Sequence, residues 1–525
     1  MKSITFILAL LLFASGIAHG QAGYLDKTFG NGGAVTIQID NRNIAPRDIE
    51  ILPDGRILHA GWMDGDIFPN TYIYILIHKE DGSIDSSFGK FGYAIFSGVF
   101  TIGEVNVSLY QNGKILVYGD MSKDGPLYMS QPFAIRFLAD GRIDSSFGNS
   151  GLYFEDGFHS RSYFRKVKIH DDGTLTAVGV INLNSDLSYR PRPTITKITS
   201  DGRRDTSFGD QGIVLIGDSS YIGDVAGQSF TRDGQTIIAF AHPQSLQSGL
   251  HMIKCDLNGA LDSTFGENGE VRMQLSDGED AIYSIIETSD GNIVCLVGAK
   301  ILSKQQSLLL RFKNDGVLDK SFGDDGITGS IDSKGSSYFL CYIDSNNNII
   351  MAGHIYEGCV TRRFSTTRYL SDGVKDSSYG KLGVSYECSE QLDPGGQMAI
   401  QRDGKYVAVG NYLSPDGNYI GALFRLNNIA TSSVSGSILP KPSISLHPTP
   451  SAENCTVTYT LPTSGECIMA LRDESGKKVR VFAQNEYRTV GEHKEELDLR
   501  GLASGVYFLQ VESNGSIQTA KLIKQ

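Results

Sequence analysis

The sequence lacks the motifs by which many enzymes and nucleic-acid-binding proteins are recognised. It has no His-Glu-x-x-His metal motif, no Gly-x-Ser-x-Gly turn, no phosphate-binding glycine loop and no dense run of lysine and arginine. Its 59 acidic residues outnumber the 47 basic ones, and the resulting net charge of −12 would repel a nucleic-acid backbone. We therefore expect no catalytic residues, no cofactor or metal, and no nucleic-acid partner.

Cysteine is scarce and irregularly placed. None of the seven cysteines falls in Cys-x-x-Cys spacing, which disfavours a zinc site. Cys455 and Cys467 are expected on adjacent strands and could pair. The others are expected to be small buried hydrophobic residues, or to form one or two disulfides after export: Cys255, Cys295, Cys341, Cys359 and Cys388.

Long hydrophobic runs are also missing. The apolar stretch at residues 4–13 is too short to span about 30 Å of hydrocarbon. It follows Lys2 and precedes Ala18-His19-Gly20, whose small residues fit a cleavage site. Residues 1–20 are therefore predicted to be a signal peptide, and the mature chain is expected to begin at Gln21 without a transmembrane segment. No cysteine follows the cleavage site, which disfavours a lipoprotein anchor.

A phrase of the form Asp-x-Ser/Thr-Phe-Gly occurs seven times, with Tyr379 in place of Phe in the last copy. Its aromatic residues are 59, 59, 61, 57, 57 and 57 residues apart. A fixed long period indicates one supersecondary unit copied side by side. The Asp, aromatic and Gly residues of the phrase are predicted to be structural: Asp26, Phe29, Gly30, Asp85, Phe88, Gly89, Asp144, Phe147, Gly148, Asp205, Phe208, Gly209, Asp262, Phe265, Gly266, Asp319, Phe322, Gly323, Asp376, Tyr379 and Gly380.

Each unit reads as four short strands. In the second unit they are expected at residues 92–96, 104–110, 114–119 and 133–137. A Gly, Asn or Asp pair between the second and third strands recurs in every unit and marks a hairpin turn with positive φ. No helical period occurs. Four antiparallel strands in each of seven units predict an all-β fold, a seven-bladed β-propeller.

The two ends of the repeat region indicate a closed ring. The region begins at residues 25–30 with the tail of a unit, and it ends at residues 423–426 with the front of one. Placed side by side, these fragments complete one unit. A ring would join them, whereas a linear array would leave both ends uncapped.

The phrase itself has a structural interpretation. Its Asp can accept the N–H of the residue two positions later, its Phe can insert between neighbouring sheets, and its Gly lets the backbone reverse. The alternative is a set of calcium sites. A calcium loop needs more oxygen ligands, and Asn258 replaces one of the neighbouring aspartates, so we favour structure.

These units resemble the delta-60 repeat family of secreted bacterial proteins, in which Asp-Gly-x-Leu-Asp-x-Ser-Phe-Gly is followed by Gly-x-Val. The resemblance covers residues 24–426. It implies a propeller-like fold. It implies no enzymatic activity and no ligand.

The chain changes character after Asn428. A linker rich in Ser, Pro and Gly is predicted at 427–442, followed by six or seven short strands that predict a small β-sandwich. Leu499-Arg500-Gly501-Leu502-Ala503-Ser504-Gly505-Val506-Tyr507-Phe508 and the closing Lys521-Leu522-Ile523-Lys524-Gln525 resemble the type A sorting domain of the type IX secretion system of Bacteroidetes. The resemblance covers residues 443–525, although His447-Pro448-Thr449-Pro450 departs from the usual entry motif. It implies the type IX machinery as a partner and a secreted or cell-surface location. An accessory adhesive sandwich is the alternative.

Function is expected where the repeats differ, in the loops between the third and fourth strands of each unit. The polar and aromatic residues of these loops are the candidate ligand-binding set: Trp62, Asp64, Asp66, Tyr128, Tyr189, Arg190, Arg192, His242, Tyr356, Arg362, Arg363, Tyr412 and Tyr419. We predict a non-catalytic propeller that binds an extracellular glycan or protein. The alternative is a hydrolase or lyase acting on extracellular polysaccharide.

Overall fold

The computed structural model describes residues 22–40, 42–66, 70–98, 100–123, 130–155, 159–182, 191–217, 225–241, 249–276, 280–301, 304–330, 337–355, 363–380, 384–386, 392–393, 397–413, 419–428, 444–461, 465–473, 477–488, 491–513 and 516–525. In these residues all regular structure is β, as the sequence predicts. The chain divides into two compact units, Met1–Thr431 and Ser432–Gln525. No helix in the described part of the chain is long and apolar enough to cross a membrane. The predicted signal peptide lies outside the described residues.

Unit 1 contains a succession of antiparallel sheets, each formed by consecutive strands. The first three comprise β2 (Ile44–Ile51), β3 (Ile57–Asp64), β4 (Thr71–His78) and β5 (Tyr93–Phe96); β6 (Phe100–Leu109), β7 (Ile115–Lys123), β8 (Gln131–Phe137) and β9 (Leu152–Phe154); and β10 (His159–Ile169), β11 (Leu175–Asn182), β12 (Pro191–Ile198) and β13 (Ile213–Leu215). The strands predicted for the second repeat match β5 to β8 to within a few residues.

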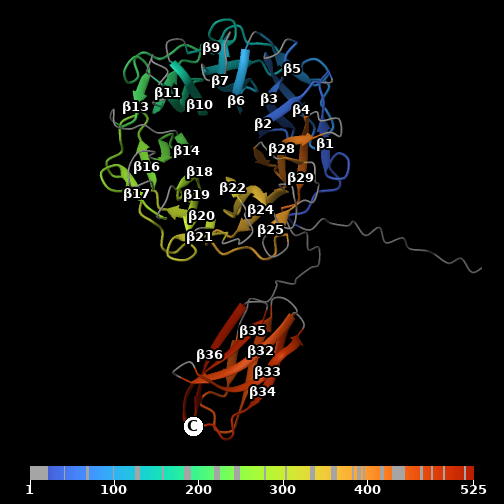
Figure 1. The fold of residues 1–525 in the computed structure, drawn as a ribbon, viewed down its shortest axis with the longest axis vertical. Helices are drawn as coiled ribbons and strands as arrows, with labels where there is room; N and C mark the ends of the chain where they lie inside the picture. Colours follow the sequence, from blue (N-terminus) through green and yellow to red (C-terminus); the bar gives the residue numbers. More distant parts are fainter. Residues whose placement is uncertain are drawn as a thin grey trace, which may run out of the picture. The chain divides into compact units, whose positions relative to one another are not determined.

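Three further sheets follow the same order. They comprise β14 (Val225–Phe230), β15 (Thr236–Ala241), β16 (Leu250–Cys255) and β17 (Glu270–Met273); β18 (Ala281–Glu287), β19 (Ile293–Ile301), β20 (Lys304–Phe312) and β21 (Ile327–Ser330); and β22 (Ser337–Ile343), β23 (Ile349–Ile355), β24 (Arg363–Tyr369) and β25 (Val384–Tyr386). Figure 1 shows the sheets arranged around a ring, with the first strand of each towards the centre and the fourth at the rim.

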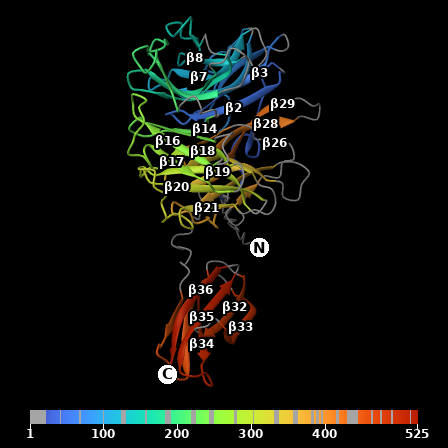
Figure 2. The ribbon, with the colours of Figure 1, turned by 60° about the vertical axis from the view of Figure 1, so that its left-hand side comes forward.

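The last sheet of unit 1 joins the two ends of the repeat region. It contains β26 (Leu392–Asp393), β27 (Met398–Ile400), β28 (Tyr406–Leu413), β29 (Tyr419–Leu426) and, from the start of the chain, β1 (Ala34–Ile37). β1 pairs with β29 in antiparallel register, Ala34 opposite Phe424. The prediction that the two fragments complete one unit is thus confirmed. β2 lies beside β28 and β29, which brings the first sheet against the last (Figures 1 and 2).

The strands are counted here within each sheet, so the turn predicted between the second and third strands of a sequence unit connects the first and second strands of a sheet. In every sheet it is a three-residue turn that ends on a residue with left-handed backbone conformation. In the first sheet, Leu52 N–H donates to Arg56 O (2.8 Å) and Gly55 N–H donates to Leu52 O (2.9 Å). Gly55 has φ = 92°, and Asn347 occupies the same position in another sheet with φ = 60°. These are residue types that tolerate left-handed backbone, so the predicted positive-φ turns are confirmed.

The repeated phrase builds a corner between neighbouring sheets. In all seven copies the Asp side chain accepts the N–H and the hydroxyl hydrogen of the Ser or Thr two residues later, as Asp26 does with Thr28 at 3.1 and 2.7 Å. The following Gly reaches the next sheet, and Gly30 N–H donates to Asp81 O (3.1 Å). At the closure, Gly380 N–H donates to Ala22 O (2.9 Å), so Ala22 takes the place that an Asp has in five other units, such as Asp81 and Asp140.

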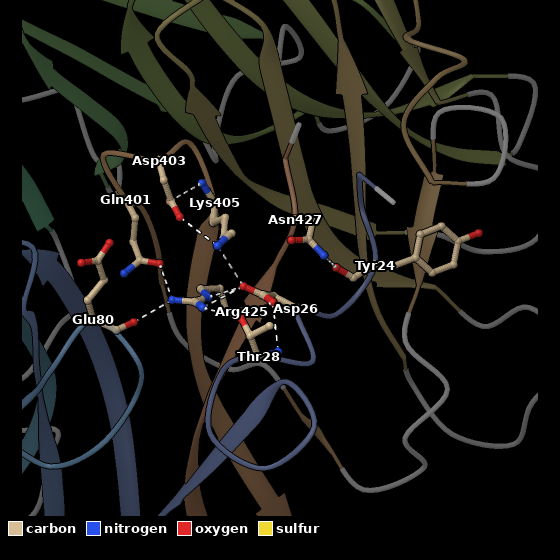
Figure 3. Close-up of polar contacts among 9 residues, drawn as sticks. All are labelled: Tyr24, Asp26, Thr28, Glu80, Gln401, Asp403, Lys405, Arg425 and Asn427. Carbon is tan, nitrogen blue, oxygen red and sulfur yellow. Dashed lines mark hydrogen bonds and ion pairs between the residues drawn. The ribbon is translucent and has the colours of Figure 1, made fainter. Parts of the chain in front are cut away.

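A basic residue on the third strand of the sheet completes this corner. We call the basic residue, the Asp and the aromatic ring the corner clamp. Arg425 pairs with Asp26 at 2.7 Å and donates to Glu80 O of the next sheet at 2.6 Å (Figure 3). Its guanidinium also lies over the Phe29 ring, 4.6 Å from the centroid. Arg136, Arg311 and Arg368 make the same set of contacts in their units.

One copy of the clamp departs from the pattern. Ile77 stands where the other units carry Arg or Lys, and Asp85 instead pairs with Arg56 from the hairpin turn at 2.7 Å. Five of the seven phrase aspartates are buried, and Asp26 shows the electrostatic consequence. Burial opposes its ionisation, but hydrogen bonds from Thr28 and Lys405 and the charge of Arg425 outweigh burial and lower its pKa to about 2.

Unit 2 is formed by two antiparallel sheets around one core. One contains β30 (Ile444–His447), β31 (Asn454–Leu461) and β34 (Gly491–Asp498), and the other contains β32 (Gly465–Asp473), β33 (Lys478–Arg488), β35 (Gly505–Ser513) and β36 (Ser516–Lys524). Val457 and Tyr459 from the first sheet share the core with Met469 and Leu509 from the second.

The suggested pairing of Cys455 with Cys467 is wrong. Both are buried free thiols. They lie on β31 and β32, which follow one another in the chain but belong to different sheets. Both side chains contribute to the core of unit 2 as small hydrophobic groups, as do Cys255 and Cys295 in unit 1.

Candidate functional site

A cavity of about 860 Å³ lies at the centre of unit 1. Its wall comes from the first strand of every sheet: β2, β6, β10, β14, β18, β22 and, in the closing sheet, β27. Among the described residues, only two others line the cavity: Tyr118 of β7, and Gln397, which directly precedes β27. The repeat therefore encloses a space to which each unit presents the same strand.

Seven equivalent residues form a ring in this wall. Each lies four residues before the residue that opens the hairpin turn, such as Leu52 in the first sheet or Tyr110 in the second. All seven line the cavity: Asp48, Asn106, Lys166, Gly227, Ser284, Leu340 and Gln397. The scaffold repeats, yet the residue type differs at all seven positions, and Gly227 leaves one of them without a side chain. A cavity walled by unlike side chains can distinguish the parts of one asymmetric ligand.

The charged residues of the wall are confined to three consecutive sheets. Asp48 and Glu50 come from β2, Glu104 from β6, and Arg165 and Lys166 from β10. Arg165 Nη1 and Glu104 Oε1 are 3.6 Å apart. The remaining lining of β14, β18, β22 and β27 carries no Asp, Glu, Lys or Arg.

Backbone N–H groups hold Asp48 across two sheets. Ile49 N–H donates to Asp48 Oδ1 (2.9 Å), and Val107 N–H of β6 donates to Oδ2 (2.8 Å). No such bond involves the Glu50 carboxylate or the Lys166 ammonium among the described residues, and both groups border the cavity. They are therefore available to a ligand.

Burial within the ring shifts the pKa values of these groups. It raises the pKa of Asp48 to about 6, although the two N–H bonds and Lys166 oppose the rise. Burial, reinforced by the charge of Asp48, raises the pKa of Glu50 to about 7. Burial also lowers the pKa of Lys166, against the attraction of both carboxylates. Two carboxylates that titrate near neutral pH in a cavity are typical of functional sites.

The opposite part of the wall is aromatic and apolar. Tyr283 from β18 and Phe339 and Leu340 from β22 line it and are half-buried. Tyr342 Oη donates to Gln397 Oε1 (2.8 Å) and accepts Met398 N–H (2.7 Å), so this phenol is held in place. One face of a bound molecule would meet charged groups and the other face would meet rings and hydrocarbon.

The loops predicted to bind the ligand connect the second and third strands of each sheet. The structure describes only some of their residues. Trp62 is partly buried against the core, and Arg47 lies over its ring at 5.7 Å. Asp64 accepts from Asn43 Nδ2 (2.7 Å), and Asp66 is bonded to Arg42 and to Tyr72 Oη (2.9 Å). Trp62 and Asp64 thus belong to β3, and these contacts of the three side chains are with β2, with β4 or with the residues that precede β2.

For the other predicted loop residues the structure describes few contacts. Arg192 donates to Gly217 O within its own sheet. The backbones of Arg363, Tyr412 and Tyr419 lie in β24, β28 and β29. The rest lie outside the described residues: Tyr128, Tyr189, Arg190, His242, Tyr356 and Arg362. The loop hypothesis thus stays a prediction.

Sequence reasoning missed the cavity residues, although one signal was available. The hairpin turn marks the same point in every unit, so counting back four residues aligns the seven ring positions. The residue type at this position differs in all seven units, whereas the hairpin turn and the Asp-x-Ser/Thr-Phe-Gly phrase recur. The argument that functional residues lie where the repeats differ therefore applies to this position as well as to the loops.

The repeated aspartates offer no metal site in the described part of the chain. No group of three or more His, Cys, Asp or Glu side chains there could hold a metal ion. Asp26, for example, already has two cationic neighbours, Arg425 at 2.7 Å and Lys405 at 3.1 Å (Figure 3).

Comparison with known proteins identifies the C-terminal unit. Residues 445–525 match the family model of the secretion system C-terminal sorting domain. The predicted sorting domain is thereby confirmed over these residues. No curated protein matches the chain.

Solved structures give distant likenesses. A polysaccharide lyase, Uly1, is 14% identical with a TM-score of 0.46, covering 79% of this chain and 94% of its own. A protein of unknown function from Dyadobacter fermentans is 10% identical with a TM-score of 0.39 (76% and 98% covered). An α-L-arabinanase of Penicillium chrysogenum, complexed with arabinobiose, is 12% identical with a TM-score of 0.39 (75% and 98% covered).

Proposed function

We propose that this chain is an exported, non-catalytic binding protein: a seven-bladed β-propeller of delta-60-type repeats that holds an extracellular ligand in its central cavity. In this proposal residues 1–20 are a signal peptide, 24–426 the propeller, 427–442 a linker and 443–525 a sorting β-sandwich. The phrase residues, including Asp26, Phe29 and Gly30, serve the scaffold. The observation that carries the proposal is the ring of seven different residues on seven equivalent positions around one cavity.

Export is supported by the sorting-domain match at residues 445–525. Such a domain is an address for the type IX machinery, which carries proteins through the outer membrane. The protein is accordingly placed outside the cell, either released or on the surface. The extracellular ligand would be a glycan or a protein segment.

Binding in the cavity is supported by Glu50 and Lys166, which form no hydrogen bond or close ion pair with a described residue, and by the facing aromatic wall. An array of glycans and peptides, applied to the mature protein, tests this. We expect saturable binding without product, and we expect Glu50→Gln and Lys166→Met each to change the affinity. Binding that neither substitution affects would place the ligand elsewhere on the protein.

A hydrolase or lyase acting on extracellular polysaccharide is the second candidate. Asp48 and Glu50 favour it, because their raised pKa values let one carboxyl group donate a proton while the other accepts one near neutral pH. Release of reducing ends or of unsaturated products from polysaccharides, abolished by Glu50→Gln, would establish the enzyme. Binding without turnover would support the first proposal.

A further inference from the structure

The cavity holds one carboxylate more than its positive groups can balance. Glu104 and Arg165 are adjacent, at 3.6 Å. Their charges cancel, which leaves Asp48 and Glu50 facing the single ammonium of Lys166. At a pH where both carboxylates are ionised, the wall therefore carries one uncompensated negative charge. An enclosed charge of this kind is costly unless a partner supplies the opposite charge.

Glu50 is the group at which that partner is missing. Both oxygens of Asp48 accept backbone N–H groups, from Ile49 and from Val107. The Glu50 carboxylate borders the cavity and receives no hydrogen bond from any described residue. It is an acceptor with no donor, which a ligand with N–H groups would satisfy.

The facing wall indicates what the rest of the ligand is like. Tyr283 and Phe339 present rings, and Leu340 presents hydrocarbon. Ring faces attract cations as well as apolar groups. An anionic ligand would meet the uncompensated carboxylate instead, and so is disfavoured.

We infer that the central cavity binds a small organic cation, in which a protonated primary amine sits at Glu50 and a ring or hydrocarbon body lies against Tyr283 and Phe339. This inference rests on the proposed function, since it takes the cavity to be the ligand site. The amine is the shared chemistry of two sources, an amino sugar and an aromatic or alkyl amine. Charge-assisted hydrogen bonds of an ammonium to a carboxylate contribute more than neutral ones.

Binding should strengthen from pH 5 to pH 7, and for an alkylamine up to pH 8. The charged residues that line the cavity with Glu50 are Asp48 on the same strand, Glu104 on β6, and Arg165 and Lys166 on β10. Asp48 and Glu50 lose their protons as the pH rises through this range. An alkylammonium keeps its proton at pH 8, whereas the more acidic ammonium of an amino sugar stays mostly protonated only up to about pH 7. The remaining titratable groups of the wall are kept neutral at these pH values by raised pKa values: Tyr118, Tyr283, Cys341 and Tyr342.

Paired probes test the inference by calorimetric titration of the mature full-length protein. Glucosamine is compared with glucose at pH 7 and at pH 5, and 2-phenylethylamine is compared with 2-phenylethanol at pH 8 and at pH 5, so that each amine is protonated at the higher pH. We expect at least one amine to bind tenfold or more tighter than its neutral partner at the higher pH, since a hydrogen bond to a charged group typically contributes about 10-fold or more. Which pair discriminates more strongly identifies the source, and the preference should shrink at pH 5.

Two matched variants locate the amine. Glu50→Gln keeps the shape of the side chain and should abolish the preference for the amine, whereas Lys166→Met should preserve or increase it. The melting temperature of each variant checks that it is folded. Equal binding of the two members of both pairs, or a preference that survives Glu50→Gln, would overturn the inference.

The outcome also separates this inference from the proposed function. Neutral probes that bind as well as the amines, and are lost with Glu50→Gln, would leave the cavity as the ligand site but reject the ammonium. Amine binding that survives Glu50→Gln and is lost with Trp62→Ala would reject both.

Discussion

Arg425 and Asp26 form a buried ion pair across 399 residues of sequence, with nitrogen and oxygen 2.7 Å apart and each side chain 6% exposed. The pair joins the end of the repeat region to its start, next to the pairing of β1 with β29 (Figure 3). The same clamp lies within a single unit elsewhere, as for Arg136 and Asp144. Here it closes the ring.

Breaking this pair should destabilise unit 1 strongly. Asp26→Asn leaves Arg425 buried without its counter-charge, and removing one partner of a buried pair costs about 3–5 kcal/mol. Denaturant unfolding followed by fluorescence measures this loss. The matched control is Arg142→Met, which removes a pair with Asp140 whose side chains are 76% and 52% exposed, and which should cost below about 1 kcal/mol. Equal stability of the two variants would contradict the closing role of Asp26.

The aromatic residue of the phrase should be as important as the charge. Phe265 is 1% exposed and belongs to the core shared by two neighbouring sheets, so Phe265→Ala should cost about 3–5 kcal/mol. Leu261→Ala, at a side chain that is 47% exposed, serves as the control and should change stability little. Thermal unfolding of Phe265→Ala that matches the wild type would refute the structural reading of the phrase. Ligand binding in the cavity should survive this substitution under conditions where the variant is folded.

Acid should destabilise unit 1 through a buried histidine pair. His59 and His78 are both 0% exposed, their rings stack at 5.2 Å, and their ring nitrogens have no hydrogen-bond partner among the described residues. Burial lowers the pKa of His78 from 6.5 to about 4, and that of His59 falls well below 6.5 by burial and by the neighbouring His78. In this range the unfolded chain binds more protons than the folded one, so stability falls as the pH drops below 6.5.

The size of this acid effect can be measured by substitution. His78 alone should remove about 2 kcal/mol between pH 7 and pH 5. His78→Phe should therefore flatten the pH dependence of the unfolding free energy by that amount. Tyr74→Phe alters a buried hydroxyl beside His59 without a titrating group in this range, and should leave the slope as it is. Identical slopes for His78→Phe and Tyr74→Phe would show that His78 is not the titrating group.

Removal of the C-terminal unit should stop export. A chain that ends before residue 443 is expected to fold in the periplasm and remain there, because the sorting domain matched at residues 445–525 is missing. Fractionation of cells and immunodetection of unit 1 check this. A reporter carrying residues 443–525 should be exported, which controls for a folding defect. Normal secretion of the truncated chain would show that residues 443–525 are not the sorting signal.

The sequence was sufficient for the arrangement of strands because the same local signals occur in every unit. The positive-φ turns and the phrase fix where strands end, and the split unit predicts the pairing of β1 with β29. The corner clamp was not predicted, although Arg136, Arg311 and Arg368 each precede their Asp by eight residues. That spacing was visible in the sequence, but only the fold shows that the guanidinium also covers the aromatic ring and reaches the next sheet.

The residues of the central cavity could not be predicted from local sequence signals. Asp48, Glu50 and Lys166 have no common motif, and β2 and β10 are separated by a complete sheet in the chain. Closing the ring brings the first strands together around the cavity and encloses these charges. The loops were predicted to bind the ligand because they vary most between the units. In the structure, Asp64 and Asp66 are bonded to Asn43 and Arg42, which precede β2 of the same unit.

The most direct test of the central claim, that the cavity and not the loop surface holds the ligand, compares three proteins: the wild type, the double variant Glu50→Gln/Lys166→Met, and Trp62→Ala. A panel of sugars, amino sugars and amines is screened for compounds that raise the melting temperature of the wild type. We predict that these compounds lose their effect on the double variant and keep it on Trp62→Ala. Loss on Trp62→Ala with an unchanged response of the double variant would contradict the account.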